Sequence, residues 1–327
     1  MLRAILCLFA AACFLPAGAA EPVLVVVEKV GSHVGFYSAE GQLLGKAPTG
    51  DTPHEMVFSK DGQFVYTTDN GSLLLETPGA GGNTVSVVNV RRRKSAGSIS
   101  LGDFRRPHGI DLDPKSGLLA VSTELPDRLV LIDPAARKVV KSYPTGGKTA
   151  HIVTFGPGGT YAYVSNSGSG TVAAIRVSDG QTKLIQTGVR PEGSILSPDG
   201  KLLYVADRTA GTVSMIDTGK NEKVGEVRTG EGPVRVGVTP DGKTLAYGMY
   251  AGEGAGFIDT ASRKVLGEIK LTGQIVSMTM SRDGRLAYCS AQDLDRVYVL
   301  DVATRKLVRT LQLAPKSGPD PVMEAPR

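Results

Sequence analysis

The sequence predicts an all-β fold, a seven-bladed β-propeller with four-stranded antiparallel blades. The first observation is a repeat, because the dipeptide Asp-Gly recurs at 199–200, 241–242 and 283–284, 42 residues apart each time. The second is the composition, since 41 Gly and 19 Pro among 327 residues disfavour a helical repeat. Self-similarity at this period, with about four strands per unit, is typical of a propeller.

The clearest unit covers residues 190–230. Runs rich in Val, Leu, Ile and Tyr predict its strands, which we expect at Glu192–Ser197, Lys201–Ala206, Thr212–Asp217 and Lys223–Arg228. Between the first two strands, Ser-Pro-Asp-Gly supplies a residue with preset φ and a glycine that is free to adopt positive φ. A single sheet of this size cannot bury both faces, so it needs neighbouring copies.

Six complete units are expected, and they begin near Pro53, Pro107, Ala150, Pro191, Pro233 and Ile275. Three strands precede them, at Val23–Lys29, His33–Ser38 and Leu43–Pro48. A single strand, Pro319–Ala325, follows them. We expect these three N-terminal strands and the C-terminal strand to form the seventh blade, which closes the ring and covers its edge strands.

Residues 1–20 have the pattern of a secretory signal peptide. Arg3 precedes the apolar run Ala4–Leu15, and small residues follow. The run is too short to span a bilayer. We expect cleavage after Ala19 or Ala20 and a periplasmic or secreted protein.

The expected mature chain, residues 21–327, is predicted to be one propeller domain, a monomer without a transmembrane segment. The formal net charge of the whole chain is +5, and the basic run Arg91–Lys94 falls in a predicted turn, so we expect no nucleic-acid binding. Of three cysteines only Cys289 remains, which excludes an intramolecular disulfide. It stands in an apolar strand, where we expect a buried, unreactive thiol.

One unit contains a longer loop than the others, Asp69–Asn83, between its second and third strands. Loops on this face of a propeller often carry function. Two interpretations are open: Leu73–Leu75 form a cap over the channel mouth, or the insertion is disordered.

Three histidines occupy the same position in successive units, four residues before the large apolar residue of the first strand. Alignment of the units gives for this slot, in chain order, His54, His108, His151, Glu192, Val234 and Val276. The slot lies where the innermost strand begins, beside the channel mouth. Because two units have valine there, the fold does not require histidine in the slot.

Two roles for the slot residues are open. Three imidazoles and a carboxylate could hold a divalent transition metal, with His54, His108, His151 and Glu192 as ligands. Alternatively, each histidine makes a hydrogen bond within its own blade.

Arginines form a second group at the same mouth. Arg106 and Arg190 stand two residues before the slot, and Arg208 and Arg235 belong to the same face. Guanidinium groups in a concave mouth suit a carboxylate or phosphate ligand, and we expect Arg106, Arg190 and Arg208 to bind it. Solvated loop arginines are the alternative. We also expect Arg106 and Arg190 to keep the slot histidines neutral near pH 7.

Several segments resemble the YVTN-type β-propeller repeats, namely Tyr163–Asn166 (YVSN), Tyr204–Asp207 (YVAD), Gly211–Asp217 (GTVSMID) and the Ser-Pro-Asp-Gly turn. The resemblance covers nearly the whole expected mature chain. Similar proteins include surface-layer proteins, haem-binding nitrite reductase domains, amine dehydrogenase subunits and seven-bladed lactonases. The resemblance therefore implies the fold but no single function.

The comparison with the lactonase propellers implies a site with a His, a Glu and arginines in adjacent blades. His151, Glu192, Arg208 and Arg235 are similar in placement and are the catalytic candidates. His151 and Arg235 stand one residue away from the family positions. In a regular strand such an offset turns the side chain to the other face of the sheet.

The sequence thus predicts an exported propeller that binds a ligand or partner at the channel mouth. The expected partner is a small anionic ligand or a cell-envelope or redox protein. The alternative function is an enzyme with a His/Glu/Arg site, either metal-dependent or a lactonase-like hydrolase.

Overall fold

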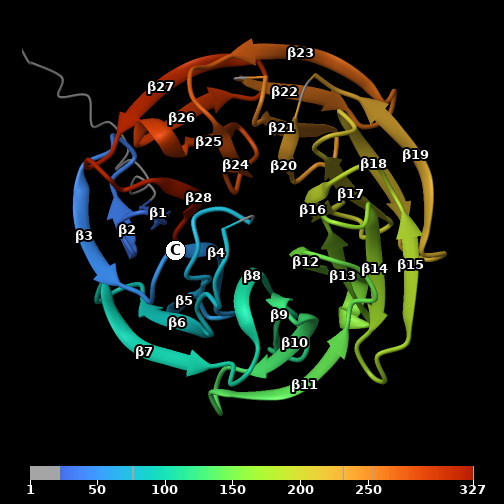
Figure 1. Cartoon of the computed structure of the whole chain (residues 1–327). Coiled ribbons are helices and arrows are strands. Elements are labelled where there is room, and N and C mark those ends of the chain that lie inside the picture. The colour runs from blue at the N-terminus through green and yellow to red at the C-terminus, as the bar shows by residue number, and fades with distance from the viewer. Residues whose placement is uncertain (1–22, 76, 231, 253, 327) are drawn as a thin grey trace, which may run out of the picture.

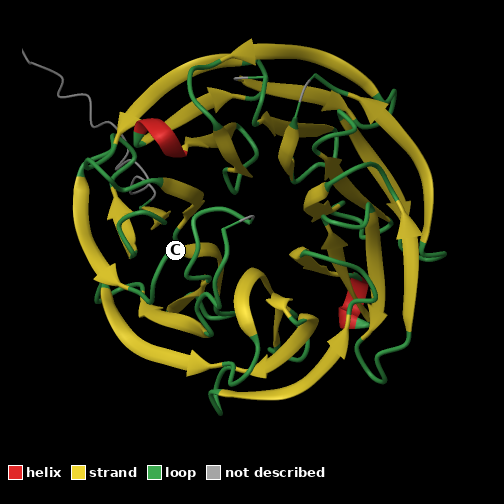
Figure 2. Ribbon diagram, in the orientation of Figure 1, coloured by secondary structure: helices red, strands yellow, loops and turns green. Residues whose placement is uncertain are grey.

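The strands form seven four-stranded antiparallel sheets, arranged as blades in a ring (Figure 1). The computed structural model describes residues 23–75, 77–230, 232–252 and 254–326. In these ranges the only helical segments are two short 3₁₀ turns, Pro157–Gly159 and Gln292–Leu294 (Figure 2). The seven-bladed propeller predicted from the repeat is confirmed.

We number the blades from the N-terminus, and each begins with its innermost strand. Blade 1 consists of β28 (Pro319–Glu324), β1 (Leu24–Glu28), β2 (His33–Tyr37) and β3 (Leu43–Pro48). Blade 2 consists of β4 (Pro53–Phe58), β5 (Phe64–Asp69), β6 (Thr84–Asn89) and β7 (Lys94–Ser100). Blade 3 consists of β8 (Arg105–Leu112), β9 (Leu119–Leu125), β10 (Asp127–Asp133) and β11 (Lys138–Pro144).

The remaining four blades follow in chain order. Blade 4 consists of β12 (Ala150–Phe155), β13 (Tyr161–Asn166), β14 (Thr171–Arg176) and β15 (Thr182–Gln186). Blade 5 consists of β16 (Pro191–Leu196), β17 (Leu202–Asp207), β18 (Thr212–Asp217) and β19 (Glu222–Arg228). Blade 6 consists of β20 (Pro233–Val238), β21 (Thr244–Met249), β22 (Gly254–Asp259) and β23 (Lys264–Lys270). Blade 7 consists of β24 (Ile275–Met280), β25 (Leu286–Ala291), β26 (Arg296–Asp301) and β27 (Lys306–Gln312).

The ring closes as predicted, between the two ends of the described chain. β28 pairs antiparallel with β1, with Leu24 opposite Glu324 and Val26 opposite Val322. Val322 is fully buried and packs with Tyr37 of its own blade and Val297 of blade 7. The strand therefore covers the edge of β1 and joins two neighbouring blades.

The middle strands of each blade are buried on both faces, because a neighbouring blade covers each side. Cys289 lies in such a strand, β25, and is fully buried as expected; burial raises the pKa of its thiol. Residues 91–93 of the basic run lie in the turn between β6 and β7, and Lys94 begins β7. Among the described residues no helix is long and apolar enough to span a membrane.

Every innermost strand contains a shift of pairing register near its start, where the predicted slot falls. In blades 2 to 7 the shifts lie between Pro53 and Met56, Pro107 and Ile110, Ala150 and Val153, Pro191 and Ser194, Pro233 and Arg235, and Ile275 and Ser277. Blade 1 has one between Val26 and Glu28, opposite β28. Such β-bulges break the strict alternation of side chains and re-aim the residues within them.

Candidate functional site

The slot residues line one cavity of about 390 Å³ at the channel mouth. The six positions that the sequence alignment placed in the slot all contribute to it. Blade 1 adds a seventh, Asp320, which follows Pro319 as His54 follows Pro53. Asp320 was missed by the sequence analysis, although the shared proline offered a signal for it.

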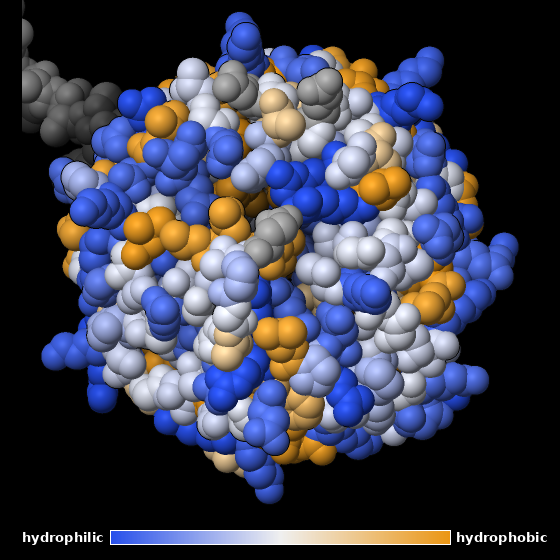
Figure 3. Space-filling view, viewed as in Figure 1, coloured by the Kyte–Doolittle hydropathy of each residue, from blue (hydrophilic) through white to orange (hydrophobic). Residues whose placement is uncertain are grey.

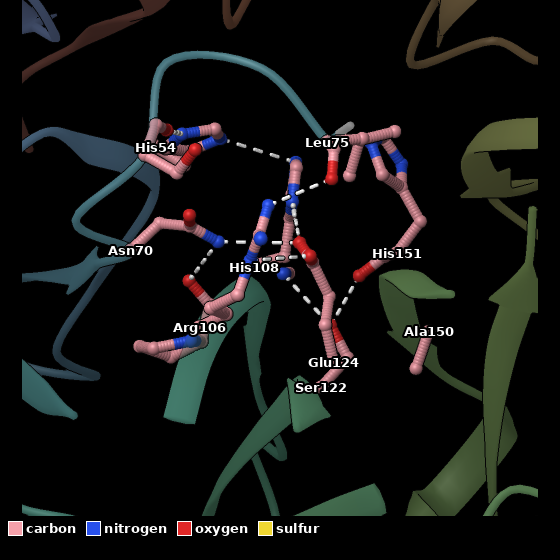
Figure 4. Close-up of polar contacts among 12 residues, drawn as sticks. His54, Asn70, Leu75, Arg106, His108, Ser122, Glu124, Ala150 and His151 are labelled. Carbon is pink, nitrogen blue, oxygen red and sulfur yellow. Dashed lines mark hydrogen bonds and ion pairs between the residues drawn. The ribbon is translucent and has the colours of Figure 1, made fainter. Parts of the chain in front are cut away.

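Two of the histidines form a hydrogen-bonded chain between blades 2 and 3 (Figure 4). His54 Nε2 lies 2.7 Å from the carbonyl oxygen of Ser72, and His54 Nδ1 lies 3.2 Å from His108 Nε2. His108 Nδ1 in turn lies 3.0 Å from Glu124 Oε1. Each of the two therefore makes one hydrogen bond within its own blade, to Ser72 or to Glu124, as the blade-internal alternative expected, and the contact between the two rings joins the blades.

The Ser72 carbonyl fixes the direction of the protons in this chain. A carbonyl can only accept, so His54 carries its proton on Nε2 and accepts at Nδ1 from His108 Nε2–H. A neutral His108 then has no proton on Nδ1. Its hydrogen bond to Glu124 therefore needs a proton on the carboxyl group.

The electrostatics agree with a protonated Glu124. Burial raises the pKa of Glu124 to about 7, although the Arg106 guanidinium lies 2.8 Å away and lowers it. Burial holds the pKa of His54 and His108 well below the usual range, and nearby positive charges add to this effect. The histidines are thus neutral near pH 7. The largest cause is burial, and the cations that contribute are Lys29 and Arg235 rather than the expected Arg106 and Arg190.

The four proposed metal ligands share the cavity without forming a coordination site. His54 and His108 use both ring nitrogens in the hydrogen-bonded chain. No three His, Cys, Asp or Glu side chains within the described ranges are grouped so that they could hold a metal ion. His151 packs beside His108, with ring centroids 3.9 Å apart. This geometry does not support the predicted metal site.

His151 presents a ring nitrogen to the cavity. Its Nδ1 lies 3.5 Å from the carbonyl oxygen of Glu192, while Nε2 makes no hydrogen bond to any residue of the described ranges. Burial, together with the charge of Arg235, lowers the pKa of His151 to about 3. The imidazole is therefore neutral at physiological pH.

The Glu192 carboxylate is buried and held by two arginines. Glu192 Oε1 accepts hydrogen bonds from Arg190 Nε at 2.8 Å and from Arg208 at 3.1 Å. Burial alone would raise the pKa of Glu192, but the positive charges of Arg208 and Arg235 and the hydrogen bond from Arg190 outweigh it, and the net shift is downward. Arg208 also stacks on Tyr250, with its guanidinium carbon 3.6 Å from the ring centroid.

Two further ion pairs complete the polar part of the site. Arg235 contacts Glu55 at 2.5 Å, and Lys29 contacts Asp320 at 3.5 Å. The sequence analysis missed Lys29, Glu55 and Tyr250. Glu55 directly follows the slot in blade 2, but nothing in the repeat pattern indicates its partner in blade 6.

The one-residue offset does not turn His151 and Arg235 away from the site. Both side chains line the same cavity as Glu192 and Arg208. The expectation of reversal assumed a regular strand, whereas β12 and β20 are bulged at these positions. The four catalytic candidates are therefore brought together.

Arg106 has a different place from the other arginines. It is buried, does not line the cavity, and donates hydrogen bonds to the carbonyl oxygens of Leu74, Leu75 and Thr77. It thus anchors the loop between β5 and β6 instead of facing a ligand. The leucines of that loop line the cavity, so the cap interpretation is the one that the structure supports.

Comparison with curated proteins finds lactonases at low identity. The chain is 23% identical over 236 residues to a 6-phosphogluconolactonase of Serratia proteamaculans, covering 62% of this chain and 68% of the relative. It is 27% identical over 191 residues to a 6-phosphogluconolactonase of Sodalis glossinidius, covering 52% and 54%. The match to the second relative spans only about half its length.

Solved structures share the fold. A hydrazine synthase structure from Kuenenia stuttgartiensis has a TM-score of 0.68 at 21% identity, covering 81% of this chain and 88% of that one. The dihydro-heme d1 dehydrogenase NirN has a TM-score of 0.67 at 17% identity, covering 96% and 78%. At these identities the likeness concerns the fold alone. The family model described as "Lactonase, 7-bladed beta-propeller" matches residues 38–251. The chain belongs to this family of seven-bladed β-propeller lactonases.

Proposed function

We propose that this protein is a lactonase-like hydrolase that opens the ring of a small anionic lactone at the channel mouth. One observation carries the proposal. A neutral imidazole whose Nε2 makes no hydrogen bond to the described residues, that of His151, faces the same cavity as a buried carboxylate held by two guanidinium groups. Membership of the lactonase family supports the same reaction class.

In the proposed reaction His151 acts as general base. Its Nε2 takes a proton from a water molecule, and the resulting hydroxide attacks the lactone carbonyl carbon. The ring C–O bond then breaks, and the imidazolium returns the proton to the leaving alkoxide, which gives a hydroxy acid. Arg208 and Arg235 line the cavity and supply N–H donors for the negative charge that develops on the carbonyl oxygen.

The low pKa of His151 makes an anionic substrate part of this mechanism. Burial and the positive charges of Arg235 and Lys29 depress its pKa to about 3, which keeps the base unprotonated but weak. A bound anion offsets those charges and raises the pKa of the imidazole toward the range of an effective base. Substrates without a negative charge should therefore react more slowly.

The test is hydrolysis of a panel of lactones by the full chain. A pH-stat measures the acid that each ring opening releases. The panel includes 6-phosphogluconolactone, the substrate in the relatives' names, and neutral lactones of the same ring size. His151→Gln should lower kcat about 100-fold or more, and Arg208→Met should lower kcat as well, because it removes a donor to the developing oxyanion. His33→Gln is the matched control, because His33 lies in β2 and does not line the cavity. No hydrolysis of any lactone, or an unaffected His151→Gln variant, would contradict the proposal.

Binding without catalysis is the second candidate function. The strongly depressed pKa of His151 favours it, because a group that holds protons weakly is a poor base. It predicts that anions bind with no turnover, that Arg208→Met abolishes binding, and that His151→Gln preserves it. Calorimetric titration alongside the pH-stat assay separates the two candidates.

A further inference from the structure

A second concave surface lies on the face of the ring opposite the channel mouth. Figure 3 shows the mouth face, where hydrophobic and hydrophilic side chains lie next to each other around the centre. Because β4 begins at the mouth and the strands of blade 2 alternate in direction, the turns after β4 and after β6 lie on the other face. These two turns and residues 325–326 line a groove of about 1120 Å³, which we call the basic groove.

The basic groove carries an excess of positive charge. Among its lining side chains five are cations and one is acidic, and these are Arg91, Arg92, Arg93, Lys94, Arg137 and Asp61. None of the five cations forms an ion pair with a residue of the described ranges. The Asp61 carboxylate is engaged in its own turn, where it accepts hydrogen bonds from Ser59 Oγ at 2.6 Å and from Gln63 N–H at 3.0 Å. Beside the lining, two further cations and two further acids offset each other, namely Lys60, Lys138, Asp133 and Glu324.

The repeat shows which of these cations belong to the scaffold. In blades 3, 6 and 7 the corresponding turn begins with Asp, has small residues at its third and fourth positions and ends with Arg-Lys, at 133–138, 259–264 and 301–306. Blade 2 shares the Arg-Lys end. Arg93 and Arg137 have positive φ, 54° and 52°, and donate to the carbonyl oxygens of Leu44 and Ala96 in the outermost strand of the preceding blade. This arginine therefore joins neighbouring blades.

Three positions of the blade 2 turn depart from the repeat, and each departure adds positive charge. Asn89 stands in place of the aspartate, and Arg91 and Arg92 stand in place of the small residues. The turn itself is preserved, because Asn89 Oδ1 accepts from Arg92 N–H at 2.8 Å as Asp259 Oδ1 does from Ser262 N–H at 2.7 Å. The Arg91 and Arg92 side chains are exposed and make no hydrogen bond to the described residues. The fold gives no reason for these charges, which indicates a role in binding.

The shape and lining of the groove favour an extended chain as its occupant. Part of the lining is apolar and includes Phe64, Val90 and Pro326. A small anion would leave most of the volume unfilled. A flat membrane surface would reach the exposed guanidinium groups but not the lining between the turns. A polypeptide with alternating acidic and apolar residues can contact both, and arginine clusters recognise acidic motifs through bidentate hydrogen bonds.

We infer that the basic groove binds an acidic, extended segment of a partner protein. Its carboxylates pair with Arg91, Arg92 and Lys94, and its apolar side chains contact Phe64 and Val90. The groove is separate from the channel mouth, so this inference does not depend on the proposed hydrolase. Because ion pairs at an exposed surface are screened by salt, the affinity should fall as ionic strength rises.

The experiment is fluorescence anisotropy of a labelled peptide of repeated Glu-Glu-Leu, titrated with the full chain at low and at physiological ionic strength. The wild type should bind it, and a Gln-Gln-Leu peptide should not bind. The triple variant Asn89→Asp/Arg91→Ala/Arg92→Ser should weaken binding about tenfold or more. This variant has the residues that blade 6 carries at the same positions, so the fold should be kept.

The matched control is Lys220→Ala/Lys264→Ala/Lys306→Ala. It changes the net charge by the same amount at exposed positions of the corresponding turns in blades 5 to 7, outside the groove. The control should bind the peptide like the wild type. Arg91→Ala alone leaves the capping residue in place and should show part of the loss, which provides the comparison if the triple variant melts at a lower temperature.

Three results would overturn the inference. The first is a wild-type protein that does not bind the acidic peptide. The second is equal weakening in the triple variant and the control, because net charge rather than the groove would then determine binding. The third is binding to phosphatidylglycerol vesicles that the triple variant loses, without any peptide binding, since the arginines would then contact a membrane.

Discussion

Arg235 and Glu55 are 180 positions apart in the sequence, and their side chains form an ion pair of 2.5 Å across the central channel. The pair joins blade 6 to blade 2. Both side chains are largely buried, with 12% and 14% of their surface exposed. Burial raises the pKa of Glu55 despite the nearby guanidinium. The buried carboxylate therefore depends on the charge of Arg235 to remain ionised.

Removal of one partner is predicted to cost more than removal of both. Glu55→Gln should lower the free energy of unfolding by about 3 kcal/mol, because it leaves a buried guanidinium without its counter-charge. The double variant Glu55→Met/Arg235→Met should lose much less. Urea unfolding of the three proteins measures this difference. Equal losses for the single and double variants would show that the guanidinium left without Glu55 carries no extra cost, which would contradict the prediction.

Glu124 is predicted to make stability depend on pH. Its pKa is about 7 in the folded protein, above the ordinary value of 4.5. The stabilisation from its proton is therefore complete below about pH 4.5 and is lost as pH rises through 7. Glu124→Gln mimics the protonated carboxyl group and should remove this loss, which amounts to about 3 kcal/mol between pH 5 and pH 8. Unfolding experiments at both pH values check it. If wild type and variant lose stability in parallel, Glu124 is ionised and His108 holds the proton.

Deletion of residues 319–327 is predicted to destabilise the protein strongly. It removes β28, exposes the edge of β1 and takes Asp320 from the channel. The melting temperature should fall by several degrees and aggregation should increase in light scattering. Deletion of residues 326–327 alone is the control, since it leaves β28 intact. An unchanged melting transition without β28 would contradict the closure.

Export is predicted from the first 20 residues, which lie outside the described part of the chain. The mature protein should begin at Ala20 or Glu21 and be recovered outside the cytoplasm. Mass spectrometry of the intact exported protein locates the new N-terminus. Full-length protein that retains residues 1–20 in the exported fraction would rule out cleavage.

The repeat period made the fold readable from the sequence, because every blade needs the same turns and the same apolar strands. It also placed His54, His108, His151 and Glu192 at one level of the ring. The partners of these residues could not be read in the same way. They depend on distances across the channel between blades that are far apart in the chain, as for Arg235 and Glu55.

The contacts of Arg106 could not be predicted from the sequence for a second reason. It shares its position with Arg190, two residues before the slot, yet only Arg190 lines the cavity. The difference arises from the inserted loop of blade 2, whose carbonyl groups engage the Arg106 guanidinium. A loop without a repeated counterpart has no alignment from which its contacts could be predicted.

The bulge at the start of every innermost strand has a consequence for the evolution of the ring. A bulged residue lies outside the regular ladder, so its identity does not affect strand register. The ring already tolerates acidic, aromatic and aliphatic side chains there, as Asp320, His108 and Val276 demonstrate. Substitutions in the slot can therefore change the charge or polarity of the side chain at the channel mouth without changing the strand pairing. Each blade can vary its slot residue independently of the other blades.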